Sequence, residues 1–168
     1  VQKVCRLQLI SCLIGKQNSA VGIGILLGHR KICRTDADMI ARAKKYIDAI
    51  LASQKQDGWI CPCRDEERKD YDTWAVQLIS KVLVVYYECS GDERIPEVVY
   101  RVLKNYYELL KNGTIRLFRW GKARWYETFI AINFVDKIYH EAWLKDLARI
   151  LKDQGFDYNA FVEIWKRP

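Results

Sequence analysis

The chain has 168 residues, of which 50% are hydrophobic and 29% are charged, and it contains only 3 prolines. This length and composition predict one globular domain with a real hydrophobic core and exclude a disordered protein. The formal net charge is +7, but residues 1–35 hold six cations and no acid, so the rest is nearly neutral and lacks the concentrated basic face that nucleic-acid binding needs.

Residues 1–34 form a basic and apolar N-terminal segment to which we assign no fold. Its two apolar blocks are separated by Lys16 and Gln17. No run therefore reaches the roughly 18 uncharged apolar residues that a membrane span requires. We predict no membrane span in this chain.

Residues 35–168 are predicted to be one helical domain. Thr35 and Asp38 match a capping box, which predicts a helix that begins there and ends in the loop around Gly58. A second helix is predicted from about Thr73 to Cys89, with Asp72 available as its N-cap. Further helical patterns follow at about 95–112, 125–139, 141–153 and 156–165. No stretch alternates as a strand, so the predicted fold class is all-α.

Short turns and long connections alternate along this domain. The turns at 86–95 and 136–144 lie about 50 residues apart, and the connections at 54–74 and 114–127 are long and rich in tryptophan and charge. A repeat of this period indicates stacked helical hairpins, about three in number.

Four segments carry a resemblance to a known family: Ala43–Gln54 running into Asp57-Gly58-Trp59, Asp72-x-Trp74, Tyr86–Arg94, and Trp143–Arg149. In this order they resemble the beta-L-arabinofuranosidase-like glycoside hydrolases over about residues 36–158. The resemblance implies an (α/α) toroid, in which inner and outer rings of helices surround a central pocket. A complete toroid needs about twice the helices predicted here, so we expect about half of a six-hairpin ring. The chain is then a fragment of a larger enzyme, or a shortened relative that pairs with a second copy as a homodimer.

The resemblance also implies retaining hydrolysis by a cysteine nucleophile held by zinc, with a glutamate as the acid. In the family these groups follow the matched region, so no zinc ligand and no nucleophile is placed on this chain. Cys61 and Cys63 do not take their place. The chain has no second cysteine pair at metal spacing and only two histidines, so we predict no four-ligand zinc site. Free thiols in a reducing compartment favour a cytoplasmic location.

The two aromatic connections are the candidate sites, because loops on a rigid scaffold commonly carry binding residues. A sugar site needs flat aromatic faces together with groups that fix hydroxyls. The candidate substrate-binding residues are Asp57, Trp59, Arg64, Trp74, Trp120, Arg124 and Trp125. Glycoside cleavage needs two carboxyl groups roughly 5 to 9.5 Å apart, and Asp72 and Glu127 are the candidates. Both lie near predicted helix starts, so helix capping is the competing interpretation, and it is the favoured one for Asp72.

Three functional hypotheses follow. The chain is part of a carbohydrate-active hydrolase, inactive alone because its nucleophile is not placed here, or it is a non-catalytic helical-repeat module that binds a glycan or a protein. The third is a terpene-cyclase-like toroid, suggested by Gln54-x-x-Asp57-Gly58-Trp59. It ranks last because no acidic cluster for cation initiation is visible.

Overall fold

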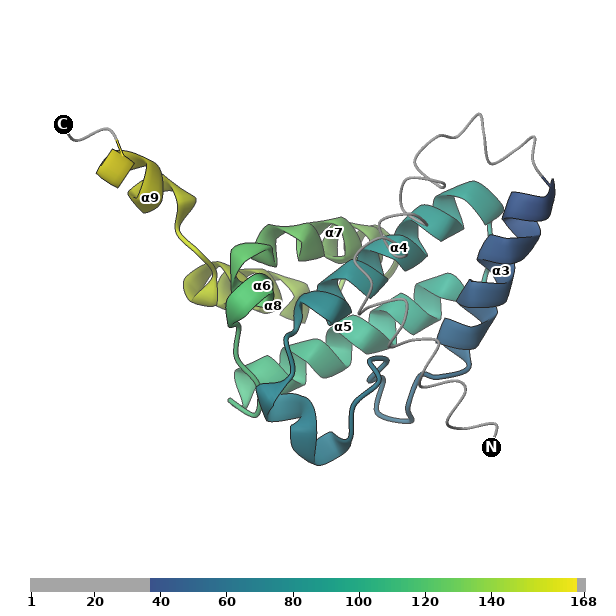
Figure 1. The fold of residues 1–168 in the computed structure, drawn as a ribbon, viewed down its shortest axis with the longest axis horizontal. Helices are drawn as coiled ribbons and strands as arrows, with labels where there is room; N and C mark the ends of the chain where they lie inside the picture. The colour runs from purple at the N-terminus through teal and green to yellow at the C-terminus, as the bar shows by residue number, and fades with distance from the viewer. Residues whose placement is uncertain (1–36, 166–168) are drawn as a thin grey trace.

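The computed structural model describes residues 37–165, and these residues form helices with no strand (Figure 1). The predicted all-α class is therefore confirmed for the described part of the chain. Its α-helices are α3 (Ala37–Leu51), α4 (Trp74–Ser90), α5 (Ile95–Lys111), α6 (Arg119–Ala123), α7 (Thr128–Tyr139), α8 (Trp143–Gln154) and α9 (Tyr158–Trp165). Two 3-10 helices, η1 (Asp65–Asp70) and η2 (Trp125–Glu127), precede α4 and α7. The segment 1–34 and the predicted capping box at Thr35 lie outside the described residues.

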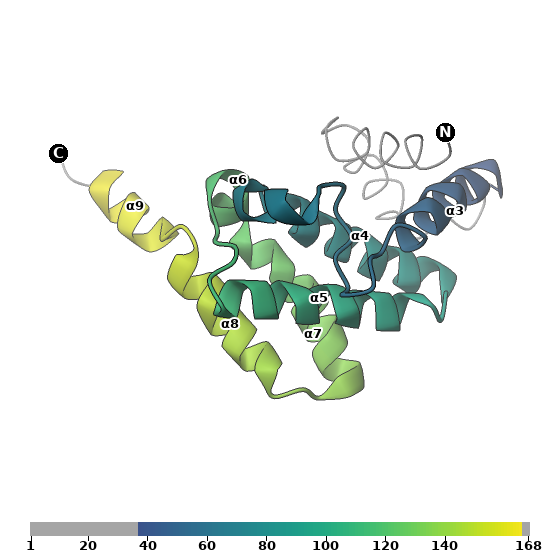
Figure 2. The ribbon, with the colours of Figure 1, turned by 90° about the horizontal axis from the view of Figure 1, so that it is seen from below.

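Two complete helical hairpins make up the body of the described chain. The first pairs α4 with α5, and the second pairs α7 with α8. Helix α7 packs against both α4 and α5, and α8 packs against α5, so the two hairpins stack (Figure 2). This stacking is what the repeat of about 50 residues predicts. The half-ring of a toroid and its third hairpin remain predictions, because α3 and α9 flank the two described hairpins as single helices.

Helix α4 is buried over most of its surface. Its buried side chains are Ala75, Val76, Gln77, Leu78, Ile79, Ser80, Val82, Leu83, Val84 and Tyr86. A helix covered by one neighbour buries a single stripe, whereas α4 contacts α5, α6, α7 and η2. The polar residues Gln77 and Ser80 are tolerated in this core because each side chain makes hydrogen bonds, Ser80 to the carbonyl of Val76 at 2.8 Å. Helix α4 is thus the central element of the described fold.

The turns between paired helices are set by residues in the left-handed conformation. Gly91 caps α4 with a φ of 67°, and its backbone N–H donates to the carbonyl of Tyr87. His140 caps α7 in the same way with a φ of 53°. Left-handed caps satisfy the last carbonyls of a helix and reverse the chain, so these positions fix where each hairpin turns. The helix predicted to end at about Cys89 ends at Ser90.

The second aromatic connection, residues 114–127, was predicted to be a loop, and the structure corrects this prediction. It contains α6 and η2, so Trp120 lies on a short helix, and the helix predicted from Trp125 begins as an α-helix only at Thr128. A five-residue helix with glycine at its centre has little intrinsic stability, so no local pattern predicts it. Contacts with the start of α4, described below, hold it in place.

Helix α9 extends away from the two hairpins (Figure 1; Figure 2). Every side chain described on it is exposed, including the large apolar residues Tyr158, Phe161, Val162 and Ile164. Within the described residues, no helix is long and apolar enough to cross a lipid bilayer.

Candidate functional site

Asp72 joins the two aromatic connections that are far apart in sequence. Its Oδ1 accepts the backbone N–H of Trp74 at 3.1 Å and that of Gly121 at 2.8 Å. Its Oδ2 accepts the backbone N–H of Trp120 at 3.2 Å. One carboxylate therefore satisfies backbone donors at the starts of both α4 and α6. This arrangement fixes the position of α6 relative to α4.

Gly121 allows α6 to lie directly on the start of α4. A Cβ atom at this position would lie 2.4 Å from Oγ1 of Thr73 and 3.1 Å from Oδ1 of Asp72. The carbonyl of Gly121 accepts a hydrogen bond from Nε2 of Gln77 at 3.1 Å, and the same nitrogen lies 3.2 Å from the hydroxyl of Tyr106. The backbone of α6 is thus hydrogen-bonded to Asp72, just before α4, and to Gln77 of α4, so side chains on α6 have a fixed support.

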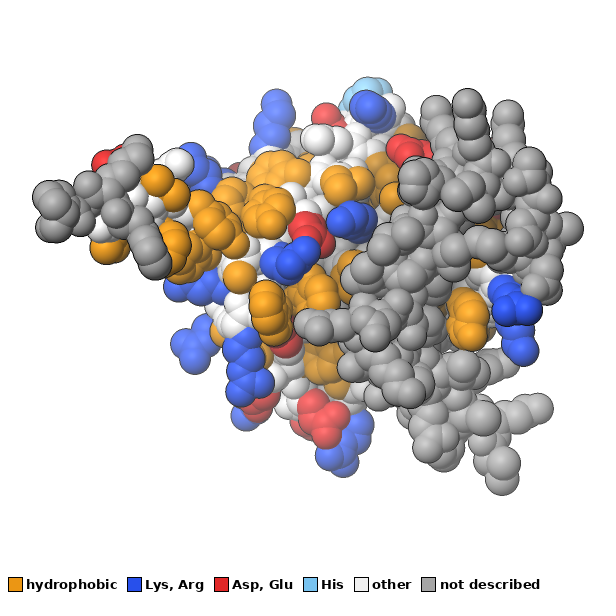
Figure 3. All heavy atoms as spheres, turned by 45° about the horizontal axis from the view of Figure 1, so that its top comes forward, with side chains coloured by type: hydrophobic (Ala, Val, Ile, Leu, Met, Phe, Trp, Pro, Cys, Tyr) orange, Lys and Arg blue, Asp and Glu red, His pale blue; other side chains and the backbone are white. Residues whose placement is uncertain are grey.

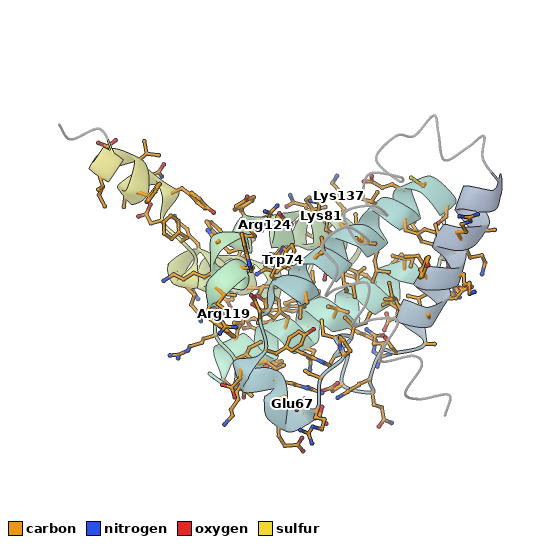
Figure 4. All side chains as sticks on the ribbon, viewed as in Figure 1. Glu67, Trp74, Lys81, Arg119, Arg124 and Lys137 are labelled. Atoms are coloured by element: carbon orange, nitrogen blue, oxygen red, sulfur yellow. The ribbon has the colours of Figure 1, made fainter. Side chains whose placement is uncertain are left out.

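Three side chains form an aromatic and cationic surface above this support, which we call the α6 face: Trp74, Trp120 and Arg124. The ring centroids of Trp74 and Trp120 lie 6.2 Å apart with a 42° angle between the planes. The guanidinium of Arg124 lies 5.9 Å from the ring centroid of Trp74. Trp120 is 52% exposed, although it is one of the largest apolar side chains. Figure 4 shows Trp74 and Arg124 together where α4 meets α6.

Glu127 lies beside the α6 face but is only 6% exposed. Its Oε1 accepts a hydrogen bond from Nε of Arg124 at 2.6 Å, and its Oε2 lies 3.7 Å from Nζ of Lys81. The hydrogen bond to Glu127 raises the pKa of Arg124 above its ordinary value. Glu127 therefore positions Arg124 against Trp74. Sequence analysis missed Lys81, although it follows Trp74 by seven residues and so lies on the same face of α4.

Trp125 connects η2 to the segment between α8 and α9. Its Nε1 donates to the carbonyl of Phe156 at 3.2 Å, and its ring lies edge-on to Phe129. A Cβ on Gly155 would approach this ring to 2.5 Å. The ring is thus packed against backbone, so its contacts are those of a structural residue.

The remaining candidates form a separate group around η1, at the far end from Arg124 in Figure 4, where Glu67 is labelled. Trp59 is 2% exposed, and its Nε1 donates to the carbonyl of Cys61 at 2.7 Å. The guanidinium of Arg68 lies 4.8 Å from the Trp59 ring. Burial leaves Trp59 no open face on which a sugar can stack, so its role in this structure is packing.

Arg68 is the residue that organises this group, and sequence analysis missed it. It is 6% exposed and pairs with both Asp57 and Asp65. Burial opposes ionisation of Asp57, but hydrogen bonds from Arg68 and from the Trp59 amide outweigh it, and the pKa of Asp57 is lowered. Arg64 is 81% exposed at its side chain and pairs with Glu67. Among the described residues, no hydrogen bond or ring contact joins Asp57, Trp59 or Arg64 to the α6 face.

Cys61 and Cys63 are both reduced. Cys61 is buried, and this burial raises the pKa of its thiol. Cys63 is half-buried, and its pKa is raised for the same reason. Residues 37–165 contain no group of three or more His, Cys, Asp or Glu side chains that can hold a metal ion.

Comparison of the chain with protein-family models, with curated proteins and with solved structures found no match.

Proposed function

We propose that this chain is a helical module that binds carbohydrate through the α6 face. The observation that carries the proposal is that Trp120 stays 52% exposed on a backbone fixed by Asp72. Exposing a large indole forfeits the free energy that its burial would contribute. A rigidly held, exposed indole next to a second indole and a guanidinium is a surface suited to a ligand that is both apolar and rich in hydroxyls.

A sugar ring fits these groups chemically. Its C–H faces are apolar and flat enough to pack on the rings of Trp120 and Trp74. Its hydroxyls accept hydrogen bonds from the N–H groups of Arg124, which carries five donors in a fixed plane. Glu127 already orients Arg124 through a 2.6 Å hydrogen bond from Nε to Oε1. The Arg124 side chain therefore loses little conformational entropy when a ligand binds. The resemblance to beta-L-arabinofuranosidase-like enzymes makes arabino-oligosaccharides one class of sugar to test.

The same geometry supports binding more than cleavage. Glycoside hydrolysis uses two carboxyl groups that reach the scissile bond. Both oxygens of Asp72 accept backbone N–H groups, and Glu127 is 6% exposed and held by Arg124 and Lys81. In the described residues, neither candidate carboxylate is therefore presented to a ligand on the α6 face.

The test is a binding measurement with Trp120→Ala. Intrinsic tryptophan fluorescence and isothermal titration calorimetry are recorded with arabino-oligosaccharides and a panel of other oligosaccharides. We expect the chain to bind at least one of them and Trp120→Ala to weaken that binding by about 1–3 kcal/mol, the range for loss of an aromatic interface anchor. Tyr46→Ala is the matched control, because Tyr46 is an exposed aromatic residue on α3. No binding to any saccharide, or equal loss in both variants, would contradict the proposal.

We also propose that two copies of the chain associate through α9, in keeping with the homodimer expected from the sequence. An eight-residue helix is marginal in water by itself. Helix α9 nevertheless carries four large apolar residues that are each 44% to 66% exposed: Tyr158, Phe161, Val162 and Ile164. Figure 3 shows hydrophobic side chains along α9 and on the adjoining surface of the body. A second copy offers an identical apolar helix, so the contact is self-complementary.

A further inference from the structure

The connection that carries Trp120 is unusually rich in cations. Between residues 112 and 127 it contains Arg116, Arg119, Lys122 and Arg124, and its one acid is Glu127. Arg116, Arg119 and Lys122 are exposed, and none of the three makes an ion pair within the described part of the chain. Glu127 is occupied by Arg124 and Lys81. The connection that carries Trp120 therefore exposes three cations that make no ion pair within the described residues.

Cations elsewhere on the described surface are often paired with neighbouring acids. The pairs are Lys44 with Asp48, Lys55 with Asp65, Arg64 with Glu67, Arg94 with Asp48 and Asp92, Lys104 with Glu108, and Arg149 with Asp146. Around α6 the acid closest to the backbone is Asp72, and both of its oxygens are directed to backbone N–H groups.

Arg119 adds a second and independent observation. It has a φ of 47°, and it is one of two non-glycine residues with a positive φ in the described chain. For a residue with a Cβ this conformation costs roughly 1–3 kcal/mol and persists only where surrounding contacts enforce it. The next two backbone N–H groups, those of Trp120 and Gly121, are bound by Asp72. The strained residue is therefore held in place, and its guanidinium lies 5.7 Å from the Phe118 ring.

We infer that the α6 face, together with the adjoining exposed cation Arg119, binds an acidic carbohydrate, a sugar chain that carries carboxylates, with Trp120 against a sugar ring and Arg119 against a carboxylate. This inference deepens the proposed function and rests on it. Guanidinium groups bind carboxylates with two parallel hydrogen bonds, which gives both charge and geometry. A chain of uronic acids carries a carboxylate on each ring, so one ring can pack on Trp120 while a carboxylate of the same chain binds Arg119. Lys122 contributes a point charge on the same short helix.

The experiment compares tetragalacturonate with its neutral counterpart, α-1,4-linked galactotetraose, by isothermal titration calorimetry on the full chain. The two ligands differ by a carboxylate in place of a hydroxymethyl group on each ring. We expect the acidic ligand to bind at least about tenfold more tightly at low salt, with the preference shrinking as salt is added. Arg119→Gln is expected to reduce the preference by about fivefold, which is the scale of one exposed ion pair. Lys145→Gln, an exposed cation on α8, is the control and is expected to leave it unchanged.

The outcomes separate the inference from the proposed function. Equal binding of both ligands, lost in Trp120→Ala, would overturn the acidic preference and leave carbohydrate binding intact. No binding of either ligand, together with no binding across the saccharide panel, would overturn both. Poly-glutamate and a single-stranded oligothymidylate are tested as polyanions without sugar carboxylates. If either binds as tightly as tetragalacturonate and Trp120→Ala changes nothing, the surface recognises charge alone and the inference is wrong.

Discussion

The carboxylate of Asp72 accepts the backbone N–H of Gly121 at 2.8 Å, across 49 residues of sequence. This hydrogen bond joins a residue just before the start of α4 to the middle of α6. The ring centroids of Trp74 and Trp120 consequently lie 6.2 Å apart. The candidate site therefore depends on a residue whose two carboxylate oxygens both bind backbone N–H groups.

The first prediction concerns this anchor. In Asp72→Ala, three backbone N–H groups lose their acceptor, those of Trp74, Trp120 and Gly121. Hydrogen bonds to charged groups contribute about 1.5–3 kcal/mol each in favourable cases, so we expect a loss of about 2–3 kcal/mol in the free energy of unfolding. The change in the free energy of unfolding is measured by urea denaturation. Asp153→Ala, which removes an exposed carboxylate on α8, is the control and is expected to change stability by less than about 0.5 kcal/mol.

The second prediction tests the close approach of α6 to α4. Gly121→Ala places a Cβ atom 2.4 Å from Oγ1 of Thr73, and overpacking of this kind costs about 1–3 kcal/mol. Oγ1 of Thr73 is buried and is the atom nearest to this Cβ position, so Thr73→Ala removes the obstacle. We expect the double variant to recover part of the stability lost in Gly121→Ala, as measured by thermal and urea unfolding. Additive losses in the two variants would mean that the two residues are not in contact.

The third prediction concerns acid stability. The pKa of Asp57 is lowered from its ordinary 3.8, because hydrogen bonds from Arg68 and the Trp59 amide outweigh burial. A carboxylate with a depressed pKa in the folded state stabilises the protein above its unfolded pKa, and this contribution is lost as the pH falls through the folded value. We expect the free energy of unfolding of the parent protein to decrease more steeply below about pH 4 than that of Asp57→Asn. Identical profiles of urea midpoint against pH in the two proteins would show that the Arg68 pair does not contribute.

The fourth prediction concerns α9. Because Val162 and Ile164 are exposed by 47% and 66%, we expect them to be covered when two copies associate. Sedimentation velocity over a range of concentrations is expected to show a monomer and dimer equilibrium, shifted to monomer in a Val162→Lys, Ile164→Lys double variant. Ile138→Lys is the control, because Ile138 is an exposed apolar residue at the end of α7. A parent protein that stays monomeric at all concentrations rules out this association.

The sequence alone determined the helices that have a long apolar period and a defined stop. Helix α5 is the clearest case, with Pro96 in its first turn and an apolar face that ends at Leu110, and it was predicted nearly to the residue. Gly91 also marked the hairpin turn correctly, because a left-handed cap is a local property that glycine satisfies. The repeat of these helices and turns was enough to predict that hairpins stack.

Only the tertiary structure decided which candidate residues meet. Trp59 and Trp120 look alike in sequence, each beside glycine in a charged connection, yet one is 2% and the other 52% exposed. The difference arises because the Arg68 guanidinium covers the ring of Trp59, whereas the backbone of Trp120 is hydrogen-bonded to Asp72 and its ring is left exposed. Such contacts join residues far apart in the chain, and no local period encodes them. Local propensity fixes the helices, and long-range packing fixes the surface that they present.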